Sequence, residues 1–300
     1  MVSHKTTTHH HPAIKVAVVS IGRSGTSVIS RILHEVLAVD FGDESDHIPR
    51  NHNNPDGYFE NRELLELNER ILAAVDGSVL RPPAINCFHQ LAAADKHELA
   101  ATAQERLKFY AAEKPRFGWK DPRLSLTFPI WQAAAPNVVA IIVFRDPRAV
   151  MRSIADQLDV PAESLAGLWL EYYRRIFSHT ATCPRVVVSF DQLLEEPVKV
   201  VKILADFLGM TDETETWERQ LAGIVKPKQA KHRAVAGVLS VSITLDEDTE
   251  ALYGYLRDTI NGGRQPDDAK LACLLNLPQA VPGKISPSQP KSWLARLLGR

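Results

Sequence analysis

Short apolar runs alternate along the chain with longer segments in which apolar residues recur every three to four positions. Three runs predict buried strands, at Val16–Ile21, Val138–Phe144 and Val186–Phe190. Unbroken runs rich in β-branched residues are typical of parallel strands that are covered on both faces. Strands that alternate with helices imply right-handed crossovers. The pattern therefore predicts an α/β fold, a three-layer sandwich with a central parallel sheet flanked by helices.

The covering helices are predicted from the same periodicity. They are expected at residues 25–37, 62–75, 91–112, 147–154, 165–178 and 197–208. The segment Phe117–Arg123 is expected to be the end of a further strand that runs into a turn. A polar segment at residues 40–61 is too long for a simple connection, which favours a functional loop.

The two ends of the chain differ in composition from the part between them. Residues 1–13 are polar and contain His9–His11, so we expect a disordered tail rather than a metal site. The ordered domain is expected at residues 14–260. Residues 261–300 are rich in proline, glycine and glutamine, and within them only Trp293–Leu298 has the pattern of a short amphipathic helix.

Charge and cysteine content limit the classes of function. The net charge of −1 does not favour nucleic acid as a partner, so any anion must be bound by a local cluster. The three cysteines have no metal-ligand or disulfide spacing, which fits a reducing compartment. No apolar run is long enough for a transmembrane segment. Together these features predict a cytoplasmic protein.

The first strand leads directly into a loop that is suited to bind phosphate. Gly22 and Gly25 allow a sharp turn and a close approach of the backbone to a ligand. Thr26 and Ser27 place hydroxyls and free N–H groups at the start of a helix, where an anion is favoured. The loop is not a Walker A motif, because no lysine follows Gly25.

A second phosphate motif follows the strand Val138–Phe144. Asp146 is expected to cap a helix and Pro147 to begin it. Arg145 stands at the end of the strand and Ser153 lies eight residues further on, within the helix. The segment resembles the 3′-phosphate motif of sulfotransferases that use 3′-phosphoadenosine 5′-phosphosulfate (PAPS). An arginine fork suits a phosphate dianion and a serine hydroxyl adds a neutral donor, in agreement with that resemblance.

The first loop is similar to the 5′-phosphosulfate loop of the same family, and the resemblance extends over most of residues 14–209. It implies a P-loop-like fold with PAPS as the donor and no metal. Arg23 would lie beside the oxygen that bridges phosphate and sulfate. The 5′-phosphate would be bound by residues of the loop, namely Gly22, Ser24, Gly25, Thr26 and Ser27.

The resemblance also suggests a general base in the segment Asn54–Asn61. Sulfuryl transfer requires a group that takes the proton of the acceptor hydroxyl. Glu60 is the first candidate, and His52 or His47 is the second. The alternative for this segment is structural, since Glu60 or Asn61 would also cap a helix that begins at Arg62.

Two further charged segments allow more than one interpretation. Lys120–Arg123 reads K-D-P-R and is expected at a strand end, where it would support the site, contact the acceptor or form a salt-bridged turn. Lys226–Arg233 is a basic run that would either close over the nucleotide or form a solvated turn.

These motifs predict a PAPS-dependent sulfotransferase that acts on a hydroxyl, less readily on an amine, of a small molecule, carbohydrate or glycolipid. Two alternatives stay open. A P-loop small-molecule kinase would need ATP and Mg²⁺, and the absence of a loop lysine disfavours it. A nucleotide-binding module without catalysis would bind the donor nucleotide and not turn it over. The sequence does not indicate an oligomeric state.

Overall fold

A single parallel sheet forms the centre of the molecule. The computed structural model describes residues 14–50, 57–211, 213–225 and 243–277. The sheet has the strand order β2-β1-β3-β4. Its strands are β1 (Ile14–Val19), β2 (Arg116–Lys120), β3 (Val138–Phe144) and β4 (Arg185–Ser189). The predicted parallel sheet is confirmed, and β3 has the predicted bounds.

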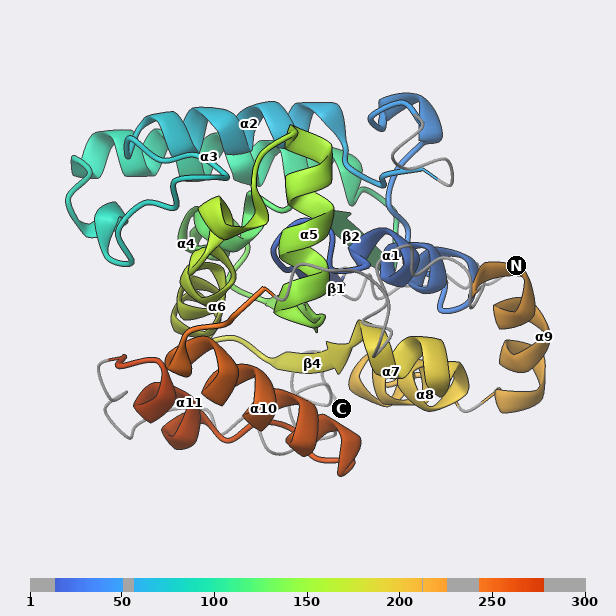
Figure 1. The fold of residues 1–300 in the computed structure, drawn as a ribbon. Helices are drawn as coiled ribbons and strands as arrows, with labels where there is room; N and C mark the ends of the chain where they lie inside the picture. The colour runs from blue at the N-terminus through green and yellow to red at the C-terminus, as the bar shows by residue number, and fades with distance from the viewer. Residues whose placement is uncertain (1–13, 51–56, 212, 226–242, 278–300) are drawn as a thin grey trace, which may run out of the picture.

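Helices cover both faces of this sheet (Figure 1). They are α1 (Thr26–Glu35), α2 (Arg62–Ala73), α3 (Ala93–Tyr110), α4 (Leu124–Ala134), α5 (Pro147–Leu158), α6 (Leu168–His179), α7 (Phe190–Glu195), α8 (Pro197–Phe207), α9 (Thr214–Ile224), α10 (Glu247–Asn261) and α11 (Asp268–Leu274). Short 3-10 turns lie at Glu44–Asp46, Cys87–His89 and Ala162–Leu165. The described chain is therefore the predicted three-layer α/β sandwich.

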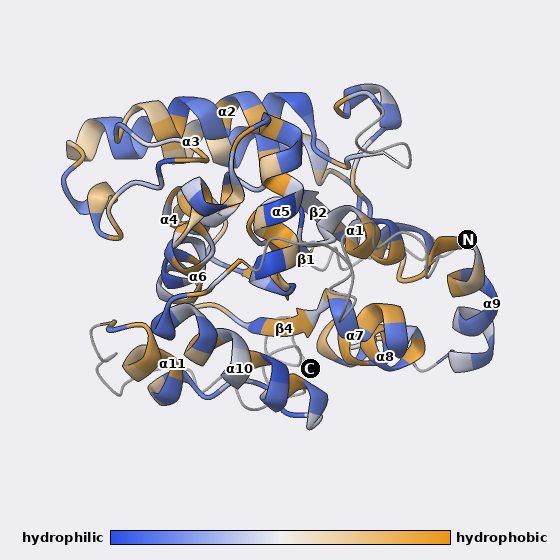
Figure 2. Ribbon diagram, viewed as in Figure 1, coloured by the Kyte–Doolittle hydropathy of each residue, from blue (hydrophilic) through white to orange (hydrophobic). Residues whose placement is uncertain are grey.

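Alternate residues of the strands enter two separate hydrophobic cores. In β1, Ala17 and Val19 face one core, whereas Val16 and Val18 face the other. All four side chains are fully buried, which explains the unbroken apolar runs of the sequence. One core is covered by α1, α7, α8 and α9, and the other by α2 to α6 together with α10 and α11. Figure 2 shows β4 as largely apolar, whereas the helices carry both apolar and polar residues.

The C-terminal part of the described chain differs from the expected tail. Helix α11 lies within residues 261–300, and its Leu271 is buried in the core. The side chain of Gln265 accepts from the N–H of Val187 at 2.7 Å and donates to its carbonyl at 3.1 Å. Gln265 thus satisfies the free edge of β4 in place of another strand. Helix α11 has only 7 residues, too few for a helical period to be recognised in the sequence.

Smaller differences concern where helices begin and end. Helix α5 continues to Leu158, beyond the expected end at Ile154. Asp146 caps α5 as predicted, by accepting from the N–H of Arg148 at 2.8 Å. After β4, the cap of α7 is Ser189, which accepts from Gln192. Oδ2 of Asp191 accepts from the N–H of Asp146 at 3.1 Å and so joins the ends of β3 and β4.

The connections after β1 and β3 leave the sheet in opposite directions. The two strands are neighbours, with Val19 paired to Ile142, so their carboxyl ends lie at the same edge. Helix α1 follows β1 and packs into one core, whereas α5 follows β3 and packs into the other. This divergence makes a topological switch point, which is where open α/β sheets bind ligands.

Candidate active site

The loop after β1 has a backbone and a neighbour that only glycine fits at position 25. Gly25 has a φ of 84°, in the left-handed region. A Cβ placed on Gly25 would lie 2.0 Å from Cδ2 of Phe190, far inside van der Waals contact distance. Helix α1 begins at the next residue, so its first N–H groups have no partner within the helix and point out of its N-terminus. The loop therefore presents backbone donors to an anion at the switch point.

A direct hydrogen bond joins this loop to the second phosphate motif. Arg23 has a φ of 68°, and its Nε donates to Oγ of Ser153 in α5 at 2.9 Å. Nη1 of Arg145 donates to the carbonyl of Arg23 at 3.1 Å. The structure thus brings together Arg23, Arg145 and Ser153, which the sequence predicted as parts of two separate motifs.

Arg145 is buried, and no carboxylate among the described residues is hydrogen-bonded to it. Its guanidinium carbon lies 5.2 Å from the centre of the Phe190 ring. Its Nε is buried and has no hydrogen-bond partner within the part of the chain that the structure describes. A buried guanidinium N–H without an acceptor is costly, so this donor is well suited to a ligand anion.

Burial and the charges of three neighbouring side chains act on the pKa of Arg145. Burial lowers the pKa of Arg145, and the nearby charge of Arg23 lowers it further, whereas Asp191 and Asp146 act in the opposite direction. Two guanidinium groups that lie this close disfavour each other's charge. A phosphate between them would relieve that repulsion.

Helix α6 supports the end of β3 with two aromatic side chains. The Tyr173 hydroxyl donates to the carbonyl of Val143 at 2.7 Å, and Nε1 of Trp169 donates to the carbonyl of Arg145 at 3.2 Å. The Ser20 hydroxyl donates to the same Val143 carbonyl at 2.6 Å. The sequence did not reveal this support, because a tryptophan and a tyrosine four residues apart on a helix are typical of an ordinary core stripe.

Glu60, the first candidate for the base, forms a buried ion pair. Its Oε1 lies 2.5 Å from Nζ of Lys120, and both side chains are more than nine-tenths buried. Lys120 also donates to Oγ of Ser27, at 3.3 Å, so the pair contacts the start of α1. Oε2 of Glu60 is buried and has no hydrogen-bond partner among the described residues. One carboxylate oxygen is therefore held by lysine, and the other has no partner in the described part of the chain.

Burial is the main cause that raises the pKa of Glu60, to about 7. The positive charge of Lys120 opposes this effect, and the negative charge of Asp121 adds to it. A carboxyl group with such a pKa changes its protonation near neutral pH, as a general base requires.

The other candidates in this segment have different positions. Asn61 caps α2 by accepting from the N–H of Leu64 at 3.1 Å, so the capping alternative holds for Asn61. Glu60 makes the ion pair instead. Nε2 of His47 lies 2.9 Å from the carbonyl of Phe41. His52 and the basic run at residues 226–233 lie outside the described residues.

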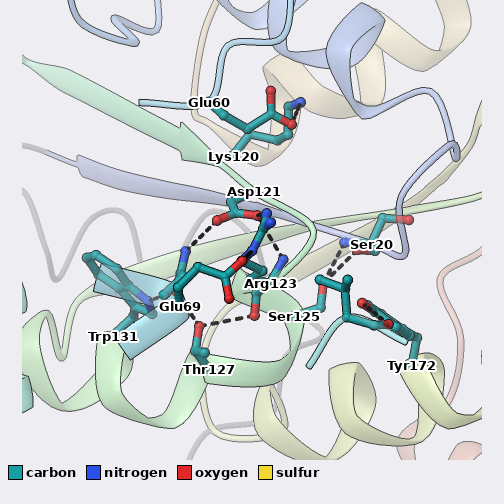
Figure 3. Close-up of polar contacts among 12 residues, drawn as sticks. Ser20, Glu60, Glu69, Lys120, Asp121, Arg123, Ser125, Thr127, Trp131 and Tyr172 are labelled. Atoms are coloured by element: carbon teal, nitrogen blue, oxygen red, sulfur yellow. Dashed lines mark hydrogen bonds and ion pairs between the residues drawn. The ribbon is translucent and has the colours of Figure 1, made fainter. Parts of the chain in front are cut away.

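The K-D-P-R segment lies at the end of β2, as predicted. Lys120 and Asp121 are both buried, and Arg123 forms ion pairs with Asp121 and Glu69 (Figure 3). Pro122 lies 3.7 Å from where a Cβ of Gly22 would be. The segment is thus both a salt-bridged turn and a support of the site, and Lys120 is the residue in it that is bonded to the candidate base.

The described residues contain neither a grouped set of metal ligands nor a helix that could cross a membrane. Within residues 14–50, 57–211, 213–225 and 243–277, no three His, Cys, Asp or Glu side chains are grouped so as to hold a metal ion. In the same ranges, no helix has the length and apolar character needed to cross a membrane.

A sequence model of the sulfotransferase family matches residues 15–214. This range contains the strand-loop-helix unit of β1, the K-D-P-R segment, and Arg145 and Ser153. The chain belongs to the sulfotransferase family. The prediction of a PAPS-dependent sulfotransferase is thereby confirmed for the family and for the class of enzyme. No curated protein matches the sequence.

Three solved structures resemble this chain to differing degrees, and the first of them supports its fold. The sulfotransferase domain of the Synechococcus PCC 7002 olefin synthase is 18% identical, with a TM-score of 0.50, and the match covers 85% of this chain and 98% of that chain. The sulfotransferase domain of the curacin biosynthetic pathway is 17% identical, with a TM-score of 0.42 over 90% of this chain and 99% of that chain. Retinol dehydratase in complex with androsterone and inactive cofactor PAP is 15% identical, with a TM-score of 0.40 over 91% of this chain and 84% of that chain.

Proposed function

We propose that this sulfotransferase moves the sulfuryl group of PAPS to a hydroxyl group of a small-molecule or glycan acceptor, with Glu60 as the general base. One observation carries the proposal. The contacts from Arg23 to Ser153 and from Arg145 to the Arg23 carbonyl join two phosphate motifs into one cationic cluster at the switch point.

The donors present fit a nucleotide with phosphates at both the 5′ and 3′ positions. The N-terminus of α1, with Ser24, Thr26 and Ser27, would bind the 5′-phosphosulfate. Arg145 and Ser153 would bind the 3′-phosphate, and the buried Nε of Arg145 supplies a donor without a protein partner among the described residues. ATP has no 3′-phosphate, so this second half of the cluster would select against it.

The proposed chemical step uses Glu60 as the base and Arg23 as the cation beside the leaving oxygen. Glu60 takes the proton of the acceptor hydroxyl as the acceptor oxygen forms a bond to sulfur. The bond between sulfur and the 5′-phosphate oxygen breaks at the same time. Arg23 donates to that phosphate oxygen and stabilises the negative charge that develops on it. The products are the sulfated acceptor and adenosine 3′,5′-bisphosphate (PAP).

The ion pair with Lys120 gives the two oxygens of Glu60 different roles. Oε1 is held by Nζ of Lys120, which fixes the carboxylate without protonating it. Oε2 has no partner among the described residues and would accept the proton. Because Lys120 also contacts Ser27, the base is linked to the helix start that would bind the 5′-phosphosulfate.

The acceptor preference is tested by direct transfer from radiolabelled PAPS. The acceptors are a phenol, an alkyl glycoside and a primary amine at equal concentrations. We expect label on a hydroxyl compound, little on the amine, and loss of transfer in Glu60→Gln. Transfer that persists in Glu60→Gln would contradict the role of Glu60. Transfer of phosphate from ATP with Mg²⁺, and none from PAPS, would instead support the kinase.

A further inference from the structure

A buried polar cluster connects α2, α4 and the end of β2. Asn68 of α2 is fully buried, and its Nδ2 donates to Oδ2 of Asp121 at 2.9 Å. Its Oδ1 accepts from the Thr127 hydroxyl at 2.6 Å and from Nε1 of Trp131 at 2.7 Å. Buried polar groups normally need such partners, and these bonds fix the orientation of the Asn68 amide.

Asp121 is bonded through both of its carboxylate oxygens. Oδ2 accepts from Asn68, and Oδ1 accepts from the backbone N–H of Arg123 at 2.9 Å and from its Nη1 at 3.0 Å. Since every one of these neighbours is a donor, the group is a carboxylate rather than a carboxylic acid. The Arg123 guanidinium also pairs with Glu69 of α2, so this side chain ties Asp121 to the same helix.

The cluster joins the two segments that carry Glu60 and Lys120. Glu60 stands two residues before α2 begins, and Lys120 directly precedes Asp121. The bond between Asn68 and Asp121 therefore attaches α2 to the end of β2 at a second point, about two helical turns from the ion pair. Figure 3 shows Asp121 between the pair of Glu60 with Lys120 and the side chains of Thr127 and Trp131.

Asp121 also supplies a fixed negative charge near Glu60. After burial, the charged groups that act on the pKa of Glu60 are Lys120, which lowers it, and Asp121, which raises it. The titratable groups of the adjoining segments are engaged elsewhere. His47 contacts the Phe41 carbonyl, and Arg62 donates to the Ser45 carbonyl.

We propose that Asp121, held by Asn68, is a positioning residue that sets the geometry and the charge environment of the Glu60–Lys120 pair. The proposal rests on the role of Glu60 as the base. It assigns a catalytic purpose to a part of the K-D-P-R segment that is not itself bonded to the candidate base.

An exchange of the side chains of Asn68 and Asp121 separates the effect of the cluster's geometry on Glu60 from the effect of its negative charge. In Asp121→Asn, one donor of the new amide must face either the Asn68 amide or the Arg123 N–H. In Asn68→Asp, two carboxylates face each other.

The double variant N68D/D121N restores every hydrogen bond of the cluster, and only the ion pair between Arg123 and residue 121 becomes a hydrogen bond to a neutral amide. In this variant, the amide at position 121 would donate to the carboxylate at position 68. The carbonyl oxygen of the same amide would accept from Arg123. The carboxylate at position 68 would still accept from Thr127 and Trp131. The exchange moves the negative charge away from Glu60 by about one hydrogen-bond length, roughly 3 Å.

Three quantities are measured in each variant. The first is the pH titration of the ¹³Cδ resonance of Glu60, which is assigned by its absence in Glu60→Gln. The others are the melting temperature and the release of PAP from PAPS with water as the acceptor. Both single variants should lose melting temperature and activity. The double variant should regain both, while the titration of Glu60 and the acidic limb of the rate move together to lower pH by roughly a few tenths of a unit. Glu69→Gln removes a carboxylate from the same network and should leave the titration in place.

Two results would overturn the proposal. One is a double variant that regains stability while Glu60 titrates at the wild-type pH. The other is single variants that keep the wild-type rate and pH profile. Failure of the proposed function is distinguishable, because Glu60→Gln would then keep its PAP release whatever the exchange does to the titration.

Discussion

The proposed PAPS-binding residues (Arg23 and Arg145, here the donor side) and the proposed acceptor-activating residues (Glu60 and Lys120, here the acceptor side) differ in how their charges are compensated. On the donor side, Arg23 and Arg145 lie close together at the ends of β1 and β3, with no carboxylate of the described chain bonded to either. On the acceptor side, Glu60 and Lys120 neutralise each other in a buried pair at 2.5 Å. Two arginines suit nucleotide phosphates, which keep their negative charge at neutral pH. Proton transfer instead requires a group whose charge can change, which is the role proposed for Glu60.

The two sides also differ in how they are assembled along the chain. Each phosphate motif is contiguous, formed by one strand end and the helix that follows it. The Glu60–Lys120 pair joins residues that are 60 positions apart, and the bond from Asn68 to Asp121 spans 53 positions. Each phosphate motif is thus local in the sequence, and tertiary packing joins the two motifs across 130 positions through Arg23 and Ser153. On the acceptor side, tertiary packing is needed for the pair itself.

The largest expected effect is on the acceptor side. Glu60→Gln removes the proton acceptor and keeps the shape of the side chain, so kcat should fall by about 10²–10⁴-fold while PAP affinity is retained. The measurement is sulfuryl transfer under saturating PAPS.

The matched control for this variant is Glu63→Gln, in the first turn of α2, which begins two residues after Glu60. Glu63 is half-exposed and pairs with Arg106, so its loss should leave kcat nearly unchanged. An equal fall in both variants would show that charge on α2, rather than a base at residue 60, is responsible.

On the donor side, Arg145→Ala should weaken PAP by about 1.5–3 kcal/mol, the range of a hydrogen bond to a charged group. Isothermal titration calorimetry with PAP measures this loss. Arg148→Ala, in the same motif, is the control, because Arg148 is partly exposed and already pairs with Glu250. If the two variants lose the same affinity, the 3′-phosphate is not bound by Arg145.

Gly25→Ala tests the shape of the donor loop. The new methyl group would meet the Phe190 ring at 2.0 Å, so we expect a loss of about 1–3 kcal/mol in the free energy of unfolding. Gly167→Ala is matched, since Gly167 has a φ of 79° and no atom within 4 Å of its Cβ position. Chemical denaturation of the two variants separates the contact with Phe190 from backbone strain, and equal losses would show that the contact does not matter.

The pH dependence of the rate should appear on the acceptor side alone. The base must be ionised, so log kcat should fall by about one unit for each pH unit below the pKa of Glu60, which burial raises to about 7. PAP affinity should change little through this limb, and a rate that is level from about pH 8 to 5 would contradict the assignment.

The same shift has a consequence for stability with a definite sign. The pKa of Glu60 in the folded protein is above its ordinary value of 4.5, so the folded state holds a proton that the unfolded state releases. This contribution to stability is present at low pH and is lost as pH rises through about 7. Glu60→Gln should therefore flatten this part of the dependence of the melting temperature on pH.

The sequence predicted the sheet, the donor loop and the 3′-phosphate motif because each depends on residues close together in the chain. The buried run Val138–Phe144 and the cap at Asp146 needed no tertiary information. The sequence did not predict that Phe190 packs against Gly25, nor that Asn68 bonds Asp121, because these contacts depend on how distant segments pack. It named Glu60 but not its partner, since Lys120 was interpretable as a turn or an acceptor contact.

Arg145 and Ser153 are proposed to form a 3′-phosphate site in one cluster with the loop Gly22–Ser27. This proposal is tested most directly by titration of the full chain with adenosine 3′,5′-bisphosphate and with ATP, each with and without Mg²⁺. We expect tight binding of the bisphosphate, independent of Mg²⁺, and much weaker binding of ATP. Equal affinity for the two nucleotides, or a strict requirement for Mg²⁺, would contradict this proposal.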